Sequence, residues 1–200
     1  MPCAGRRAVS DGSELRDVVE SVVGAFRRHG VLYYITGSLA SSVHGEFRAT
    51  NDLDVVALLE RRHLGPLVTD LSVDFFADLE QAESALDGGT SFNLLHRVTL
   101  LKVDVFPCSS AFDREAMGRA IDVAVAGMRG PLRVISKEDI LLAKLRWYRL
   151  GHETSERQRR DIEALAALNR HAFDYAYLSR WAEELGVQDL LRRCLPPSSS

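Results

Sequence analysis

The feature that most constrains the fold is a change of sequence pattern near residue 136. Before it, short apolar runs typical of strands alternate with segments of helical periodicity, and after it only helical periodicity is found. Strands mixed with helices, followed by a run of helices, indicate an α+β protein. We predict a mixed sheet flanked by helices over residues 13–135, a helical domain over 136–195, and flexible tails at 1–12 and 196–200.

The expected elements follow from apolar spacing, from glycines that end helices and from serines that begin them. In the first part we expect helices at 13–29, 39–44, 61–71 and 73–86, and strands at 31–36, 52–58, 91–95, 98–106, 121–125 and 132–135. In the last part we expect helices at 136–150, after the Ser155-x-x-Gln158 capping box, at 173–184 and at 187–194.

Composition excludes several classes of protein. No apolar run exceeds five residues, whereas a membrane span needs about 20, so we expect no membrane partner. The net charge of −3 argues against general nucleic-acid binding but leaves room for a local basic groove. Cys3, Cys108 and Cys194 are too few and too far apart for a disulfide framework or a zinc site, and we interpret Cys108 as a small apolar side chain. The first residues contain no apolar signal segment, so we expect a cytoplasmic location.

Two acidic residues open the expected strand 52–58. Asp52 and Asp54 are two positions apart, so both side chains project from one face while Leu53 and Val55 face the core. Two carboxylates held this close repel one another unless a cation lies between them, and Mg²⁺ is commonly bound by one or two carboxylates plus substrate phosphates. The pair therefore predicts a Mg²⁺ site, and the alternative is a solvated strand start.

The neighbouring segments strengthen the metal interpretation. Upstream, the strand 31–36 runs into Gly37-Ser38 and a helix, which places backbone N–H groups and a hydroxyl where an anion can bind. The alternative there is a plain turn with a serine cap. Downstream, Asp104 lies in the middle of an apolar strand, where a carboxylate needs a partner. That partner is either a shared metal ion or Lys102, which lies on the same face.

A resemblance to a known family is carried by three motifs in order: Gly37-Ser38, the run Gly45-x-x-Arg48-x-Thr50-x-Asp52-Leu53-Asp54, and Asp104. The chain resembles the nucleotidyltransferase superfamily of the DNA-polymerase-β type. More closely, it resembles the minimal nucleotidyltransferase-like proteins of prokaryotic toxin–antitoxin and phage-defence systems, including relatives of abortive-infection toxins. Their helical Lys…Arg-Asp segment is similar to Lys144-Leu145-Arg146-Trp147 followed by Arg159-Arg160-Asp161-Ile162. The resemblance covers about residues 30–190.

The resemblance implies a sheet of the nucleotidyltransferase type and metal-assisted transfer of a nucleoside monophosphate from an NTP. Asp52 and Asp54 would hold a metal ion against the triphosphate. Asp104 would share a second ion and orient or activate the incoming hydroxyl. Two Mg²⁺ ions are expected during turnover, stabilising the attacking and leaving oxygens.

The resemblance also implies contacts to the nucleotide. Gly37 and Ser38 would hold the terminal phosphates, and Arg48 is a candidate phosphate clamp because a guanidinium binds bidentately. Through the helical Lys…Arg-Asp segment, the resemblance implies that Lys144 contacts the nucleotide and that Asp161 also belongs to the nucleotide-binding site.

The helical segment 144–170 carries seven Lys and Arg against four Asp and Glu. One interpretation is a solvated helical face. The other is a surface facing an acidic acceptor such as an RNA end, through Arg157, Arg159 and Arg160. The pair Trp147-Tyr148 is interpreted as core or as a base-stacking surface.

We therefore predict a Mg²⁺-dependent nucleotidyltransferase that transfers a nucleoside monophosphate from an NTP to a hydroxyl of a protein, an RNA or a small molecule and releases pyrophosphate. The alternative is a catalytically weak or inactive binding protein of the same fold, acting with a toxin or antitoxin partner in a defence pair. This alternative is motivated by Thr36, which stands where many relatives carry a second glycine. An antibiotic-modifying nucleotidyltransferase is a third interpretation.

Overall fold

The structure, a computed structural model, describes residues 12–45 and 52–196. Its strands are β1 (Tyr33–Thr36), β2 (Asp52–Ala57), β3 (Phe75–Phe76), β4 (Phe92–His96), β5 (Lys102–Pro107), β6 (Ile121–Val123) and β7 (Leu132–Val134). Its helices are α1 (Gly12–Arg28), α2 (Gly37–Val43), α3 (Arg61–Leu71), α4 (Leu79–Gly88), α5 (Ala111–Arg119), α6 (Lys137–Leu150), α7 (Glu156–Asn169), α8 (Tyr175–Glu184) and α9 (Gln188–Cys194).

The strands form one mixed sheet in the order β3-β4-β5-β2-β1-β7-β6. At its centre β2 pairs antiparallel with β1 and parallel with β5, and β1 pairs parallel with β7. The outer strands β4, β3 and β6 join by antiparallel pairing. Mixed pairing of this kind, with helices around the sheet, confirms the predicted α+β class.

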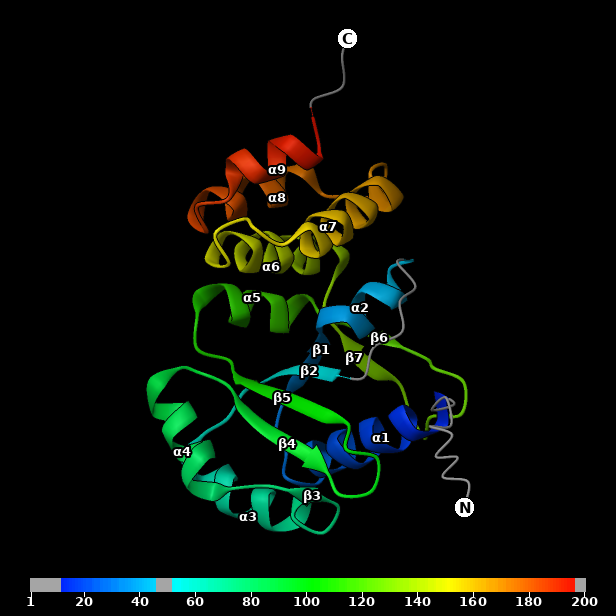
Figure 1. Cartoon of the computed structure of the whole chain (residues 1–200), viewed down its shortest axis with the longest axis vertical. Helices are drawn as coiled ribbons and strands as arrows, with labels where there is room; N and C mark the ends of the chain where they lie inside the picture. Colours follow the sequence, from blue (N-terminus) through cyan, green and yellow to red (C-terminus); the bar gives the residue numbers. More distant parts are fainter. Residues whose placement is uncertain (1–11, 46–51, 197–200) are drawn as a thin grey trace, which may run out of the picture.

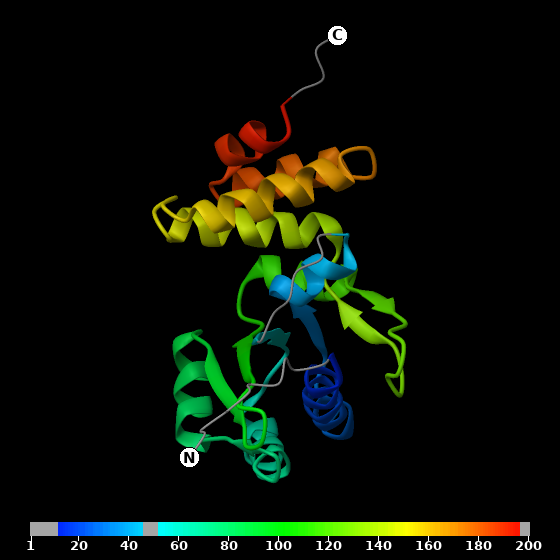
Figure 2. The same ribbon diagram turned by 45° about the vertical axis from the view of Figure 1, so that its right-hand side comes forward.

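Each strand of the centre has one apolar face. Leu53 and Val55 of β2 and Val103 and Val105 of β5 are buried, while the alternate positions include Asp52, Asp54 and Asp104. The apolar face packs toward a layer that contains α1, whose residues Val18, Val22 and Phe26 are spaced four apart and fully buried. Helices α2 and α5 lie on the opposite side of the sheet from α1 and α3, and α6–α9 stack beyond them (Figures 1 and 2).

Helix α6 is joined to its neighbours by a buried polar network. Ser136 caps α6, and its hydroxyl donates to Asp139 at 2.7 Å. The Tyr177 hydroxyl on α8 donates to the other Asp139 oxygen at 2.5 Å, and the Arg119 side chain on α5 approaches the same carboxylate. Buried apolar side chains form one cluster that runs from α1 to α9. The division into domains at residue 136 stays a prediction.

The predicted helix over 73–86 was wrong over residues 73–78. Residues Phe75–Phe76 form strand β3, because Phe75 is buried and pairs with His96 of β4. Helix α4 begins only at Leu79, where the Asp78 carboxylate accepts the backbone N–H of Gln81 as an N-cap.

Two other segments depart from the prediction. Strand β5 begins at Lys102 rather than Val98, because the chain bends at Leu100, which has a φ of 58°. Helix α5 was not predicted. Its sequence signal is the capping box in which Ser110 and Asp113 each accept the other's backbone N–H.

Some predictions fall on residues outside the described ranges. These are Arg48, Thr50 and the two tails apart from their innermost residues, 12 and 196. Within 12–45 and 52–196, no helix is long and apolar enough to cross a membrane.

Candidate active site

The acidic residues of the predicted site are placed together by strand register. Asp54 of β2 lies beside Asp104 of β5, and Asp52 lies beside Lys102. On its other side, Asp54 lies opposite Thr36, the last residue of β1. Positions in register on neighbouring strands share a face, so the three carboxylates project from one side of the sheet.

Gly37 allows the start of α2 to approach this acidic face. Its φ is +65°, and a Cβ placed there would lie 1.9 Å from the Asp54 carboxylate oxygen. Any other residue would therefore clash with Asp54 and also occupy an unfavourable backbone conformation. Thus the short Gly37-Ser38 turn brings the backbone of the helix start directly against the acid.

The electrostatic environment of Asp54 is unfavourable to its ionised form. Burial, then the carboxylates of Asp104 and Asp52, raises the pKa of Asp54 to about 6, while Lys102 and Lys144 act in the opposite direction. The folded chain thus holds a negative cluster whose repulsion its own lysines do not cancel. A bound cation would relieve that repulsion.

Asp104 has the partner that the ion-pair alternative predicted. The Lys102 ammonium lies 2.8 Å from an Asp104 oxygen, and this hydrogen bond raises the pKa of Lys102. The Lys102 side chain is half-exposed, so it can move away at little cost. The structure thus shows Lys102 as the partner of Asp104, and a metal ion at Asp104 would have to displace this lysine.

The described residues fit part of a Mg²⁺ site. No three His, Cys, Asp or Glu side chains within 12–45 and 52–196 are arranged to hold a metal ion alone. The mutual repulsion of Asp54 and Asp104 and their all-oxygen donor set nevertheless suit a hard divalent cation, for which substrate phosphates commonly supply further ligands. Asp54, Asp104 and Asp52 are the residues that would hold it.

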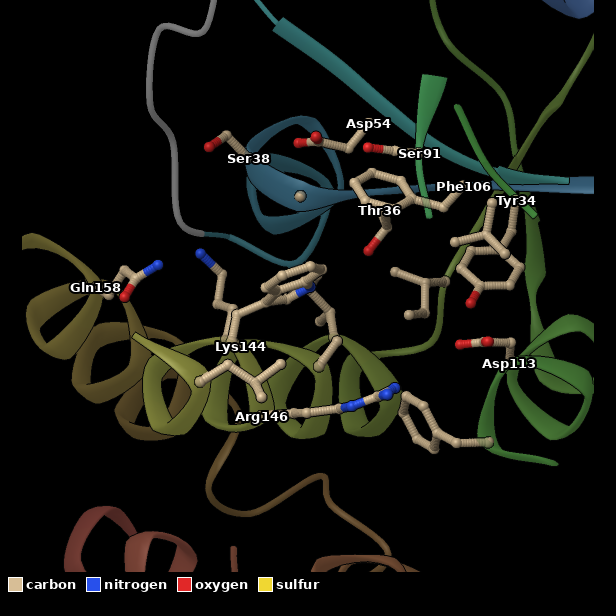
Figure 3. Close-up of a pocket in the computed structure, with 18 of the residues that line it drawn as sticks. Tyr34, Thr36, Ser38, Asp54, Ser91, Phe106, Asp113, Lys144, Arg146 and Gln158 are labelled. Atoms are coloured by element: carbon tan, nitrogen blue, oxygen red, sulfur yellow. The ribbon is translucent and has the colours of Figure 1, made fainter. Parts of the chain in front are cut away.

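A pocket of about 780 Å³ opens on this face of the sheet, between the sheet and helices α6 and α7. Figure 3 shows Ser38 and Asp54 on one wall and Lys144 and Gln158 opposite them. A volume of this size is within the range of small-molecule and cofactor sites. Asp52 and Asp104 lie beside the pocket rather than lining it.

Lys144 and Asp161 reach the pocket from two helices. Their charged groups lie 3.5 Å apart, which joins α6 to α7 at the pocket wall. Of the predicted site residues, Gly37, Ser38, Asp54, Lys144 and Asp161 therefore line one cavity. Arg48 lies outside the described residues.

The arginines of the basic helical segment lie in different surroundings. Arg157 lines the pocket, whereas Arg159 pairs with Glu156 and Glu163 on the surface of α7. These intrahelical partners three and four residues away favour the interpretation of Arg159 as part of a solvated helical face.

Trp147 and Tyr148, which are adjacent in the sequence, also lie in different surroundings. Tyr148 is buried in the core, while Trp147 is half-exposed in the pocket, with its ring 5.9 Å from that of Phe106. Cys108 is half-buried, and burial raises the pKa of its thiol to about 11, in agreement with an apolar role.

The pocket residues that were not predicted from the sequence include Tyr34 of β1, Asp113 of α5 and Arg146 of α6. One signal was present for Tyr34, which precedes Thr36 by two positions and so shares its face. For Asp113, the capping box indicates a helix start but does not indicate that the side chain faces the pocket. Arg146 lay within the matched helical motif without a stated role.

Comparisons with known proteins show the fold. No protein-family model and no curated protein matches the sequence. The solution structure of the antibiotic-resistance factor ANT(2'')-Ia is similar over 92% of this chain and 94% of that chain, with a TM-score of 0.54 and 16% identity. An antigenic nucleotidyltransferase-like protein from Paracoccidioides brasiliensis is similar over 92% of each chain, with a TM-score of 0.56 and 20% identity. ANT(2'')-Ia in complex with adenylyl-2''-tobramycin gives a TM-score of 0.51 at 16% identity, over 90% of this chain and 97% of that chain. The chain therefore has the fold of the nucleotidyltransferases.

Proposed function

We propose that the protein is a Mg²⁺-dependent nucleotidyltransferase that moves a nucleoside monophosphate from an NTP to a hydroxyl group. The observation that carries this proposal is the placement of Asp54 beside Asp104, with the Gly37 backbone packed against Asp54 at the mouth of a pocket. The shared fold supports it, since one of the similar structures holds adenylyl-2''-tobramycin.

The reaction joins the acceptor oxygen to the α-phosphorus and breaks the bond from that phosphorus to the oxygen bridging to the β-phosphate. Pyrophosphate leaves, and the acceptor proton passes to a base, for which Asp104 is the candidate. The Gly37 backbone, Ser38 and Lys144 would bind the phosphates. When bound, Mg²⁺ supplies positive charge to the triphosphate and the acid cluster.

The test is transfer of label from each of four α-labelled NTPs, in Mg²⁺, to the protein itself, to total RNA and to a small-molecule extract. We expect label in one fraction, with release of pyrophosphate and a loss of at least about 100-fold in Asp54→Asn. Asp17→Asn, an exposed carboxylate on α1, is the matched control and should retain activity. Absence of any transfer that depends on Asp54 would overturn the proposal.

A second candidate function is NTP binding without turnover. The Lys102–Asp104 ion pair favours it, because an Asp104 held by lysine neither binds a metal ion nor accepts a proton. Thr36, which lines the pocket at the phosphate end, favours it as well. Calorimetry separates the two: binding of an NTP with no pyrophosphate supports the binding protein, and pyrophosphate release supports the enzyme.

The physiological setting rests on the sequence resemblance alone. We propose that the protein acts in a toxin–antitoxin or defence pair. Growth arrest on expression, relieved by Asp54→Asn or by co-expression of the adjacent gene, is the expected result. Unimpaired growth with an active enzyme would contradict it.

A further inference from the structure

The pocket continues past Asp54 to a second polar end that the phosphate chemistry does not use. Tyr34, Asp113 and Arg146 gather there, at the end away from Ser38 and Gln158 (Figure 3). They come from β1, α5 and α6, so three elements distant in sequence build this end of the cavity.

Tyr34 provides a hydroxyl without a partner. The residue is 2% exposed and lines the pocket, and among the described residues its hydroxyl makes no hydrogen bond. Burial and the nearby Asp113 carboxylate raise its pKa, which keeps the hydroxyl protonated as a donor. The hydroxyl therefore reaches the cavity as a donor that a ligand acceptor can use.

Arg146 and Asp113 add a donor and an acceptor. No described residue forms an ion pair or hydrogen bond with the Arg146 guanidinium, although Arg149 on the same helix is paired with Glu153 and Asp189. One Asp113 oxygen accepts the Ser110 backbone N–H at 2.9 Å, and the other oxygen is left for a ligand. The far end therefore presents both hydrogen-bonding functions side by side.

An aromatic wall lies between the two ends. Trp147 is 54% exposed, and Phe106 packs against it. A flat heterocycle stacks on such a surface. With the triphosphate at the Gly37-Ser38 turn, the base of an NTP stacked on this wall would turn its edge toward the polar end.

We propose that Asp113 and Arg146 bind the edge of the nucleobase and select guanine; this inference rests on the proposed function. Guanine presents two adjacent donors, N1–H and the 2-amino group, to a carboxylate, and O6 beside them to a guanidinium. Adenine and cytosine offer one amino donor group, and uracil offers one N–H. Among the four bases, guanine thus offers the most hydrogen bonds to the Asp113 carboxylate and the Arg146 guanidinium.

The test compares non-transferable α,β-methylene analogues of GTP, ATP, CTP, UTP and ITP by calorimetry in Mg²⁺. We expect the GTP analogue to bind at least about tenfold more tightly than the others, including the inosine compound, which lacks only the 2-amino group. Asp113→Asn and Arg146→Ala should remove most of that preference while changing the affinity for the ATP analogue less than about threefold.

Ser110→Ala is the control for a purely structural effect. It breaks the capping box but leaves the Asp113 carboxylate, so the guanine preference should persist in a less stable protein. Equal binding of all analogues, preference for another base, or a guanine preference that survives Asp113→Asn would overturn the inference and leave the proposed function standing. No binding of any analogue would overturn both.

Discussion

At the scale of the residue, the ionisation of Asp54 sets a testable pH dependence. A carboxyl whose pKa rises from 3.8 to about 6 on folding binds protons more tightly in the native state, so stability falls as pH rises between these values. The shift corresponds to at most about 3 kcal/mol. We expect metal-free Asp54→Asn to be more stable than the unsubstituted protein at pH 7.5, with the difference fading near pH 4. Urea denaturation in EDTA measures this, and a gain that persists at pH 4 would contradict it.

Gly37 gives a second prediction at this scale, with a matched control in the same chain. Gly30 has nearly the same backbone angle, φ +66°, but a Cβ there meets nothing within 4 Å. Gly30→Ala should therefore cost only the conformational term, about 1–2 kcal/mol, whereas Gly37→Ala adds the clash with Asp54. Denaturation curves and nucleotide affinity together are the measurement. Equal costs, with nucleotide binding intact in both, would show that the close approach to Asp54 has no role.

The site residues that could be predicted from the sequence are those whose placement depends on local patterns. Asp52, Asp54, Gly37 and Ser38 lie within short stretches whose strand alternation and turn geometry are local, so their shared face could be inferred without coordinates. The grouping of Tyr34 with Asp113 and Arg146 depends on the packing of three distant elements, for which no local pattern exists.

At the scale of the element, helix caps and strand alternation predicted the helices and strands correctly where a segment fitted only one of the two patterns. The serine caps at 136 and 155 marked the starts of α6 and α7 correctly. Phe75 and Phe76 fitted helical spacing as well as a two-residue strand, and only their pairing with β4 decides between them. The helix over Ala111–Arg119 has a weak apolar face, so its capping box was its main local signal.

The packing of α5, α6 and α8 depends on the buried Asp139 network. Tyr177→Phe removes the donor to one Asp139 oxygen and leaves that oxygen buried without a partner, which should cost about 1–3 kcal/mol. Tyr175→Phe is the control, because its hydroxyl donates to the Arg170 carbonyl at an exposed position and should cost under about 1 kcal/mol. Urea denaturation measures both, and similar costs for the two substitutions would show that the network contributes little.

At the scale of the whole molecule, the pocket exists only because the helices α6 and α7 face the acidic side of the sheet. The sequence pattern predicted the two halves, and the resemblance implied most of the residues on the phosphate side, but neither could show that the cavity continues to α5. That continuation depends on the packing of α5 against α6 and the sheet, which no local residue pattern specifies. The functional consequence is one cavity lined by both halves of the chain.

This arrangement makes Trp147 a reporter of ligand binding. The chain has two tryptophans, and Trp181 is buried between Phe112 and Tyr177 and does not line the pocket. An NTP bound in Mg²⁺ should shield Trp147, shifting its emission to shorter wavelength and protecting it from iodide quenching. The change should saturate with nucleotide, persist in Trp181→Phe and vanish in Trp147→Phe. A saturable signal that remains in Trp147→Phe would place the nucleotide elsewhere, because only a ligand in the shared cavity contacts this side chain.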